Sequence, residues 1–258
     1  MEPPLPCYLA RCPMPLLLCA LLALLVSGSA LAIEVLAAEV PPYAIKSQQG
    51  APTGMAVEVL EEAARRLGEP LHIEVLPFAR ALSQARHRKD VLLLPPAWSE
   101  ERASHFLWIV PLLEESFVLV TDRRHHPTPL TLAEARRRGD KIGVLRNSLA
   151  HDRLRRVEGV TLELATEEVR NAQKLSLGRI SAWAAAWNTV NYNQLRAELP
   201  TSHLLRGETL QRTSLYLAAH PEFPAAQASR WRAALESMHR DGTLRRILAQ
   251  YDYQAPEP

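Results

Sequence analysis

Three polar residues in the middle of the chain are each of a type that can bind an anion. Arg102 carries a guanidinium, whose paired N–H donors match the geometry of a carboxylate. Asn147 and Ser148 precede a helix expected from Ala150, where backbone N–H groups and a hydroxyl can bind negative charge. More ordinary roles are an ion pair of Arg102 with Glu101 or another acid, and a helix cap at Ser148.

Aromatic residues near these positions could contact the apolar part of a solute. Tyr43 follows two prolines, and Trp98 lies four residues before Arg102. Trp183 and Trp187 follow further along the chain. Tryptophan supplies a large apolar surface and one N–H donor, although such residues also serve in protein cores.

Other chemistries find little support in the sequence. All three cysteines, Cys7, Cys12 and Cys19, lie near the N-terminus, in what we expect to be a leader. His125 and His126 are adjacent in a proline-containing connector, and neighbouring side chains there cannot readily bind the same metal ion. No metal-protease, phosphate-loop or serine-hydrolase motif occurs. The arginine runs lack interleaved aromatic residues, which argues against nucleic-acid binding, whereas the net charge of +2 argues neither for nor against an acidic partner. We therefore expect no cofactor, no metal and no nucleic-acid partner.

The first 32 residues have the pattern of a signal peptide. Arg11 precedes an apolar stretch from Pro15 to Val26, and small residues follow, ending in Ala30-Leu31-Ala32. Cleavage after Ala32 would release the protein into the periplasm. The alternative is an uncleaved membrane anchor, since residues 12–33 carry no charge.

The remaining chain alternates between expected strands and helices, which is typical of α/β layers around mostly parallel sheets. The clearest helix is 54–67, whose apolar stripe ends before Gly68 and Pro70. It follows a strand expected at 33–37, and the pairs Glu61/Arg65 and Glu62/Arg66 have the spacing of helical ion pairs. The other strands are expected at 71–75, 91–94, 117–121, 141–145, 160–164 and 215–219, and the other helices at 79–87, 132–138, 150–156, 167–177, 225–241 and 244–251.

Two interruptions of this alternation predict two lobes. Residues 125–129 read as a connector, and a second break is expected near Leu205–Gln211. A chain that leaves one lobe, builds another and returns makes a cleft that can close by hinge motion.

Several motifs resemble the bacterial extracellular solute-binding proteins of family 3, the receptors of polar amino-acid ABC transporters. Pro41-Pro42-Tyr43 is similar to the family's Pro-Pro-aromatic turn, and Ser99–Arg102 to its Thr-x-x-Arg segment. Its signature is matched by Gly54, Val57, Glu58, Val59, Ala63, Ala64 and Leu67, but not by Met55 and Ala56. Further matches in the same order are Phe106 with Pro111, Ile142-Gly143-Val144 with Asn147-Ser148, Leu177–Ile180, and Asp241–Leu244 with Tyr251.

This resemblance implies a two-lobed periplasmic binding protein fold of type II. Each lobe would be a mostly parallel sheet flanked by helices, with two hinge crossings between the lobes. Residues 33–120 and 213–258 would form the first lobe, and residues 121–212 the second.

The resemblance also implies a ligand site. Arg102 would bind the carboxylate of the solute, Asn147 and Ser148 would bind it from the second lobe, and Tyr43 would stack on it. Trp98 and Trp187 flank positions where the family has polar ligand contacts. The chain departs from the family at Pro95, Ala97, Ser181 and Ala186, so the part of the site that would hold an ammonium group is lost or moved.

The expected function is therefore non-catalytic capture of a small carboxylate-bearing solute, such as an amino acid or derivative, for an ABC importer. The partner would be the permease in the inner membrane, and the protein would be a monomer. One alternative is a cyclohexadienyl-dehydratase-like enzyme, for which Glu115, Glu167 and Glu168 are candidate acids. Another is a sensor or accessory protein that binds without transport.

Overall fold

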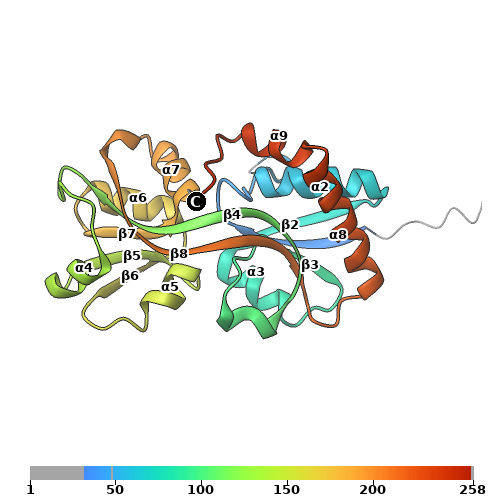
Figure 1. Cartoon of the computed structure of the whole chain (residues 1–258), viewed down its shortest axis with the longest axis horizontal. Helices are drawn as coiled ribbons and strands as arrows, with labels where there is room; N and C mark the ends of the chain where they lie inside the picture. The colour runs from blue at the N-terminus through green and yellow to red at the C-terminus, as the bar shows by residue number, and fades with distance from the viewer. Residues whose placement is uncertain (1–31, 48, 257–258) are drawn as a thin grey trace, which may run out of the picture. The chain divides into compact units, whose positions relative to one another are not determined.

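The computed structural model describes residues 32–47 and 49–256, so the expected signal peptide lies outside it except for Ala32. In this part of the chain, eight strands form one mixed sheet in the order β2-β1-β3-β8-β4-β7-β5-β6 (Figure 1). Helices flank the sheet. The predicted α/β class is confirmed.

The first half of the sheet is built around a parallel unit of three strands. β1 (Ile33–Glu39) pairs with β2 (Leu71–Pro77) on one side and β3 (Val91–Leu94) on the other. Helix α2 (Met55–Leu67) connects β1 to β2, and α3 (Phe78–Ala85) connects β2 to β3.

The second half repeats this arrangement with later segments. β5 (Lys141–Leu145) lies between β6 (Thr161–Ala165) and β7 (Ala182–Ala186) and is parallel to both. The helices of this half are α4 (Leu132–Arg138), α5 (Leu149–Leu154), α6 (Glu168–Ser176) and α7 (Trp187–Arg196).

Two long antiparallel strands join the halves. β4 (Leu107–Asp122) and β8 (Leu204–Ala219) have 16 residues each and pair along their lengths. The expected break near Leu205–Gln211 is therefore wrong, because those residues lie inside β8. Gly207 within this stretch allows the backbone of Leu130 to approach, since an added Cβ would lie 2.4 Å from the Leu130 carbonyl oxygen.

The sequence did not predict β7 and α7. β7 is an alanine-rich strand, AWAAA, that is buried throughout between β4 and β5. Such a run has neither the polar alternation nor the β-branched residues that mark strands. Helix α7, WNTVNYNQLR, contains three asparagines and no side-chain cap, so its helical propensity is weak.

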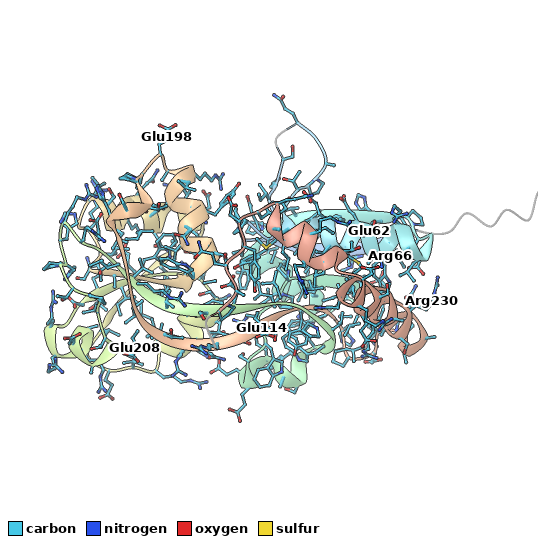
Figure 2. The ribbon with its side chains drawn as sticks, turned by 45° about the horizontal axis from the view of Figure 1, so that its top comes forward. Glu62, Arg66, Glu114, Glu198, Glu208 and Arg230 are labelled. Carbon is cyan, nitrogen blue, oxygen red and sulfur yellow. The ribbon has the colours of Figure 1, made fainter. Side chains whose placement is uncertain are left out.

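Helix α2 begins one residue after the predicted start and ends at the predicted Leu67, with Gly68 in the left-handed conformation after it. It packs against the returning helix α8 (Ala225–Arg240), which is followed by α9 (Thr243–Ala249). Arg66 bonds Glu62 on its own helix, and Figure 2 labels both residues. Arg66 also bonds Asp241 after α8. The expected Glu61/Arg65 pair is replaced by a contact of Arg65 with Glu62 at 2.7 Å.

None of the helices within residues 32–47 and 49–256 combines the length and the apolar composition that a membrane span requires.

Candidate functional site

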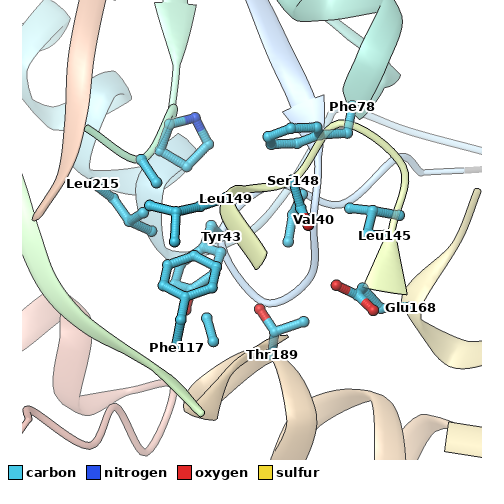
Figure 3. A pocket seen from close by; sticks show the side chains of 13 residues that line it. Val40, Tyr43, Phe78, Phe117, Leu145, Ser148, Leu149, Glu168, Thr189 and Leu215 are labelled. Carbon is cyan, nitrogen blue, oxygen red and sulfur yellow. The ribbon is translucent and has the colours of Figure 1, made fainter. Parts of the chain in front are cut away.

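A small cavity lies where strand ends from both halves of the sheet converge (Figure 3). Its volume is about 30 Å³, which is room for about one water molecule. The residues that follow the carboxyl ends of parallel strands are the usual ligand-binding positions of open α/β sheets. The lining is mostly apolar and consists of Val40, Tyr43, Phe78, Pro95, Ala97, Phe117, Leu145, Ser148, Leu149, Glu168, Ala186, Thr189 and Leu215.

Tyr43 lies in this lining because of the turn between β1 and α2. The N–H of Met55 bonds the carbonyl of Pro42, and the N–H of Ala56 bonds the carbonyl of Tyr43. Gly54 has a φ of 121°, and a Cβ there would lie 2.6 Å from the Tyr43 carbonyl oxygen. A glycine is therefore required for this turn to seat the tyrosine.

The hydroxyl of Tyr43 is already engaged inside the protein. It donates a hydrogen bond to Glu115 of β4, which also accepts from Asn188 Nδ2 at 2.5 Å and from the backbone N–H of Ser116 at 3.2 Å. Burial raises the pKa of Glu115 to about 7 and raises the pKa of Tyr43 well above its usual value. The tyrosine thus offers the cavity its ring rather than a free hydroxyl.

Ser148 and Asn147 form the start of helix α5. The Oγ atom of Ser148 accepts a hydrogen bond from the N–H of His151 at 3.2 Å, so this residue caps the helix and also lines the cavity. Asn147 has a left-handed φ of 59°, and its carbonyl turns toward Arg102. The cap and the cavity-lining role of Ser148 therefore coexist.

Arg102 connects the two halves of the sheet. It lies in the 3-10 helix η1 (Glu100–His105), where it is only 2% exposed, and its guanidinium lies 5.9 Å from the centre of the Phe78 ring. Its Nη2 atom donates to the Asn147 carbonyl at 2.8 Å and to Asp152 Oδ2 at 2.6 Å. Burial lowers its pKa, while Asp152 raises it. The carboxylate partner of Arg102 is thus Asp152 of α5.

The Nη1 atom of Arg102 is different. It is buried and has no hydrogen-bond partner among the residues that the structure describes. The sequence leaves open an ion pair of Arg102 with Glu101 or another acid, and Asp152 is such an acid. Arg102 is buried in this pair, whereas the Asp152 side chain is 21% exposed. Glu101 instead pairs with Arg156.

Glu168 places a carboxyl group at the edge of the cavity, near Leu145 and Thr189 (Figure 3). It is 6% exposed at the start of α6. Asn171 Nδ2 and Trp183 Nε1 both donate to its Oε2 atom at 2.9 Å. Burial raises the pKa of this carboxyl to about 7. Near neutral pH it can therefore be protonated or charged.

Three of the positions where the chain departs from the family pattern form part of the same wall, whereas Ser181 does not. Pro95, Ala97 and Ala186 all line the cavity. An acid is nevertheless present, because Glu168 brings one from a different element. Glu167, its neighbour, is exposed and does not line the cavity.

Three of the candidate aromatic residues do not line the cavity, namely Trp98, Trp183 and Trp187. Trp98 is 38% exposed and borders a separate outer cavity of about 410 Å³, together with Asp152 and Arg153. The Nε1 atom of Trp187 donates to Gln254 Oε1 at 2.7 Å, and Arg206 lies over its ring.

Asp152 and Thr189 are not among the residues that the sequence predicts for the site. Asp152 pairs with an arginine 50 positions earlier, so no local spacing marks it. Thr189 lies on the unpredicted helix α7, and its Oγ1 atom has no partner among the described residues. In that same part of the chain, no three histidine, cysteine or acidic side chains gather as metal ligands would.

Several solved structures have the same fold. One is a histidine kinase sensor domain with similarity to periplasmic binding proteins, with 21% identity and a TM-score of 0.78 over 88% of this chain and 98% of that chain. A mutant of ArgBP from T. maritima has 17% identity and a TM-score of 0.75, covering 86% and 95%. The ancestral amino acid-binding protein AncCDT-1, a precursor of cyclohexadienyl dehydratase, has 12% identity and a TM-score of 0.75, covering 85% and 94%.

At these identities the likeness establishes the fold alone, which is that of two-lobed periplasmic binding proteins. No curated protein matches the sequence. The model of one protein family matches residues 33–254. The chain therefore belongs to the bacterial extracellular solute-binding proteins, family 3.

Proposed function

We propose that this protein is a non-catalytic periplasmic receptor that encloses a small organic solute in this cavity and delivers it to an ABC importer. The partner would be the permease in the inner membrane. The observation that carries the proposal is the cavity itself, where residues from both halves of the sheet meet and Arg102 bonds across from one half to the other. Family membership supports a binding role in general.

The two lobes would have to separate before a solute enters. The cavity of about 30 Å³ is far smaller than the few hundred Å³ typical of ligand sites. Lobe separation would break the contacts of Arg102 with Asn147 and Asp152. We place the moving bodies at 33–120 with 213–258 and at 121–212, with the long strands β4 and β8 as the crossings.

The expected carboxylate of the solute has a competitor inside the protein. Asp152 already bonds Arg102 at 2.6 Å, so a solute carboxylate would have to displace it or bind the free Nη1 atom. We therefore propose only that the solute is a small organic molecule, without requiring a carboxylate, and that Tyr43, Ser148 and Arg102 lie at its site.

A solute screen and one variant test this proposal. Thermal-shift screening of the mature protein against amino acids, opines, organic acids and polyamines should find a solute that raises the melting temperature. Arg102→Ala should then weaken binding of that solute at least tenfold by calorimetry, because the variant loses the contacts that join the closed lobes. Unchanged affinity would remove Arg102 from the site, and a screen without any binder would contradict the receptor role.

Glu168 supports a second candidate function. A buried carboxyl with a pKa of about 7 that faces a cavity could serve as a general acid, as an enzyme that dehydrates cyclic carboxylates requires. Incubation with prephenate-like substrates separates the two functions. Product formation that Glu168→Gln abolishes would establish the enzyme, and binding without turnover would support the receptor.

A further inference from the structure

The cationic group beside the cavity already has its counter-charge. Arg102 is buried, and its guanidinium lies over the ring of Phe78, which lines the cavity. Asp152 neutralises it through a hydrogen bond of 2.6 Å, and the carbonyl of Asn147 accepts a second bond at 2.8 Å. In this closed arrangement, the charge that a solute carboxylate would supply comes from the chain itself.

The anionic group that lines the cavity has no such counter-charge. Glu168 accepts hydrogen bonds from Asn171 and Trp183, which are both neutral. The pKa of its carboxyl group is shifted only by burial and by these two hydrogen bonds. No cationic side chain of the described residues contributes to that shift. Both bonds reach the Oε2 atom, and the carboxyl group lies at the cavity edge (Figure 3).

The rest of the lining is suited to an apolar body. Phe78, Phe117, Leu145, Leu149 and Leu215 lie around the cavity. The other polar groups of the lining are hydroxyls, which bear no charge. A solute that matches the charge and the polarity of this lining would carry one positive charge, an apolar body and no negative charge.

We propose that the solute is a small amine without a carboxylate, and that Glu168 selects its ammonium group. This ligand class rests on the proposed receptor function and makes it more specific. An amino acid would place a second carboxylate beside the buried Arg102, where it would compete with the part-buried Asp152 for the guanidinium. The corresponding decarboxylated amine would leave the Arg102–Asp152 pair intact.

Matched sets of solutes test this class. Each set contains an amine, the amino acid with the same body, and the neutral alcohol: phenethylamine, phenylalanine and phenethyl alcohol, or isoamylamine, leucine and isoamyl alcohol. By calorimetry on the mature protein, the amine of a set should bind at least tenfold more tightly than the other two members. Tighter binding of the amino acid or the alcohol, or no amine binding in either set, would overturn the amine proposal.

Variants of Glu168 and Asp152 test whether these two residues determine the preference for an amine over an amino acid. Glu168→Gln can keep an oxygen that accepts from Asn171 and Trp183 while it removes the charge, so the amine should lose at least tenfold in affinity and bind no better than the alcohol. Glu167→Gln is the matched control on an exposed neighbour and should leave the affinity unchanged. Asp152→Ala frees Arg102 and should shift the preference toward the amino acid.

Equal affinities in Glu168→Gln and Glu167→Gln would overturn the role of Glu168. If the protein binds a negatively charged solute more tightly than the amine, only the amine proposal is rejected. The proposed receptor function is unaffected by that result. The receptor function itself falls only if the wider solute screen also finds no binder.

Discussion

At the scale of single residues, two buried glutamates differ in what surrounds them. Glu115 is completely buried and accepts from Tyr43, Asn188 and the backbone of Ser116. Glu168 has two donors and lies at the cavity edge. We therefore assign Glu115 to holding the tyrosine and Glu168 to contact with the solute.

The raised pKa of Glu115 predicts a pH-dependent contribution to stability. Its pKa of about 7 exceeds the usual 4.5, so the folded protein binds this proton more tightly than the unfolded chain does. The contribution is fully present below pH 4.5 and is lost as the pH rises through 7. A pKa shift of this size corresponds to about 3 kcal/mol in the free energy of unfolding.

Urea unfolding of the wild type and Glu115→Gln at pH 5 and pH 8 measures this contribution. The wild type should lose about 2–3 kcal/mol more than the variant between the two pH values. Glu114→Gln, at the exposed neighbouring position, should behave as the wild type. An identical pH dependence in Glu115→Gln and the wild type would show that this carboxyl is charged when folded.

Part of the site could be predicted from single residues. Tyr43 and Ser148 line the cavity, and Arg102 lies against its wall, because each follows a strand end or turn that local patterns mark. The partner of Arg102 could not be predicted, since it depends on how segments 50 residues apart meet. Trp98 and Trp187 illustrate the same limit, because burial of a tryptophan depends on the packing of distant elements.

At the scale of elements, the long strands β4 and β8 determine how the two halves are joined. Local patterns suffice for elements with their own start and stop signals: α2, α4, β3 and β5 agree with prediction to within one residue. They fail for β7, which is a strand because of its buried place between β4 and β5 rather than its own composition. They also fail for Gly207, whose role depends on Leu130.

Gly207→Ala tests the account of β8 as a continuous strand. The added methyl would meet the Leu130 carbonyl oxygen at 2.4 Å and the Leu119 carbonyl oxygen at 3.0 Å. We expect a loss of about 2 kcal/mol or more in the free energy of unfolding. Gly50→Ala, on an exposed turn where the nearest atom is 3.5 Å away, should change stability by less than about 0.5 kcal/mol. Equal stabilities of the two variants would contradict the close approach at Gly207.

At the scale of the whole molecule, the C-terminal segment adds a further link between elements far apart in sequence. After α9, the backbone N–H and carbonyl of Gln254 bond the side chain of Asn188 at 2.8 and 2.9 Å. The side chain of Gln254 accepts from Trp187. Because Asn188 also bonds Glu115, this segment connects α7 to the group that holds Tyr43. Any separation of the lobes must accommodate these contacts.

The proposed receptor mechanism requires that the two lobes close on a small solute. It can be tested by the distance between spin labels on Arg137→Cys in α4 and Ala233→Cys in α8, both exposed positions. The labels would be specific, because the native cysteines lie at positions 7, 12 and 19, within the expected signal peptide.

Pulsed electron-electron spin resonance on this doubly labelled mature protein gives the distribution of that distance. Without solute we predict a broad distribution that includes separated lobes, and with saturating solute a single narrow one. Calorimetry on the same sample reports whether the solute is bound. A distance distribution that stays the same while the solute binds would contradict lobe closure and the receptor mechanism built on it.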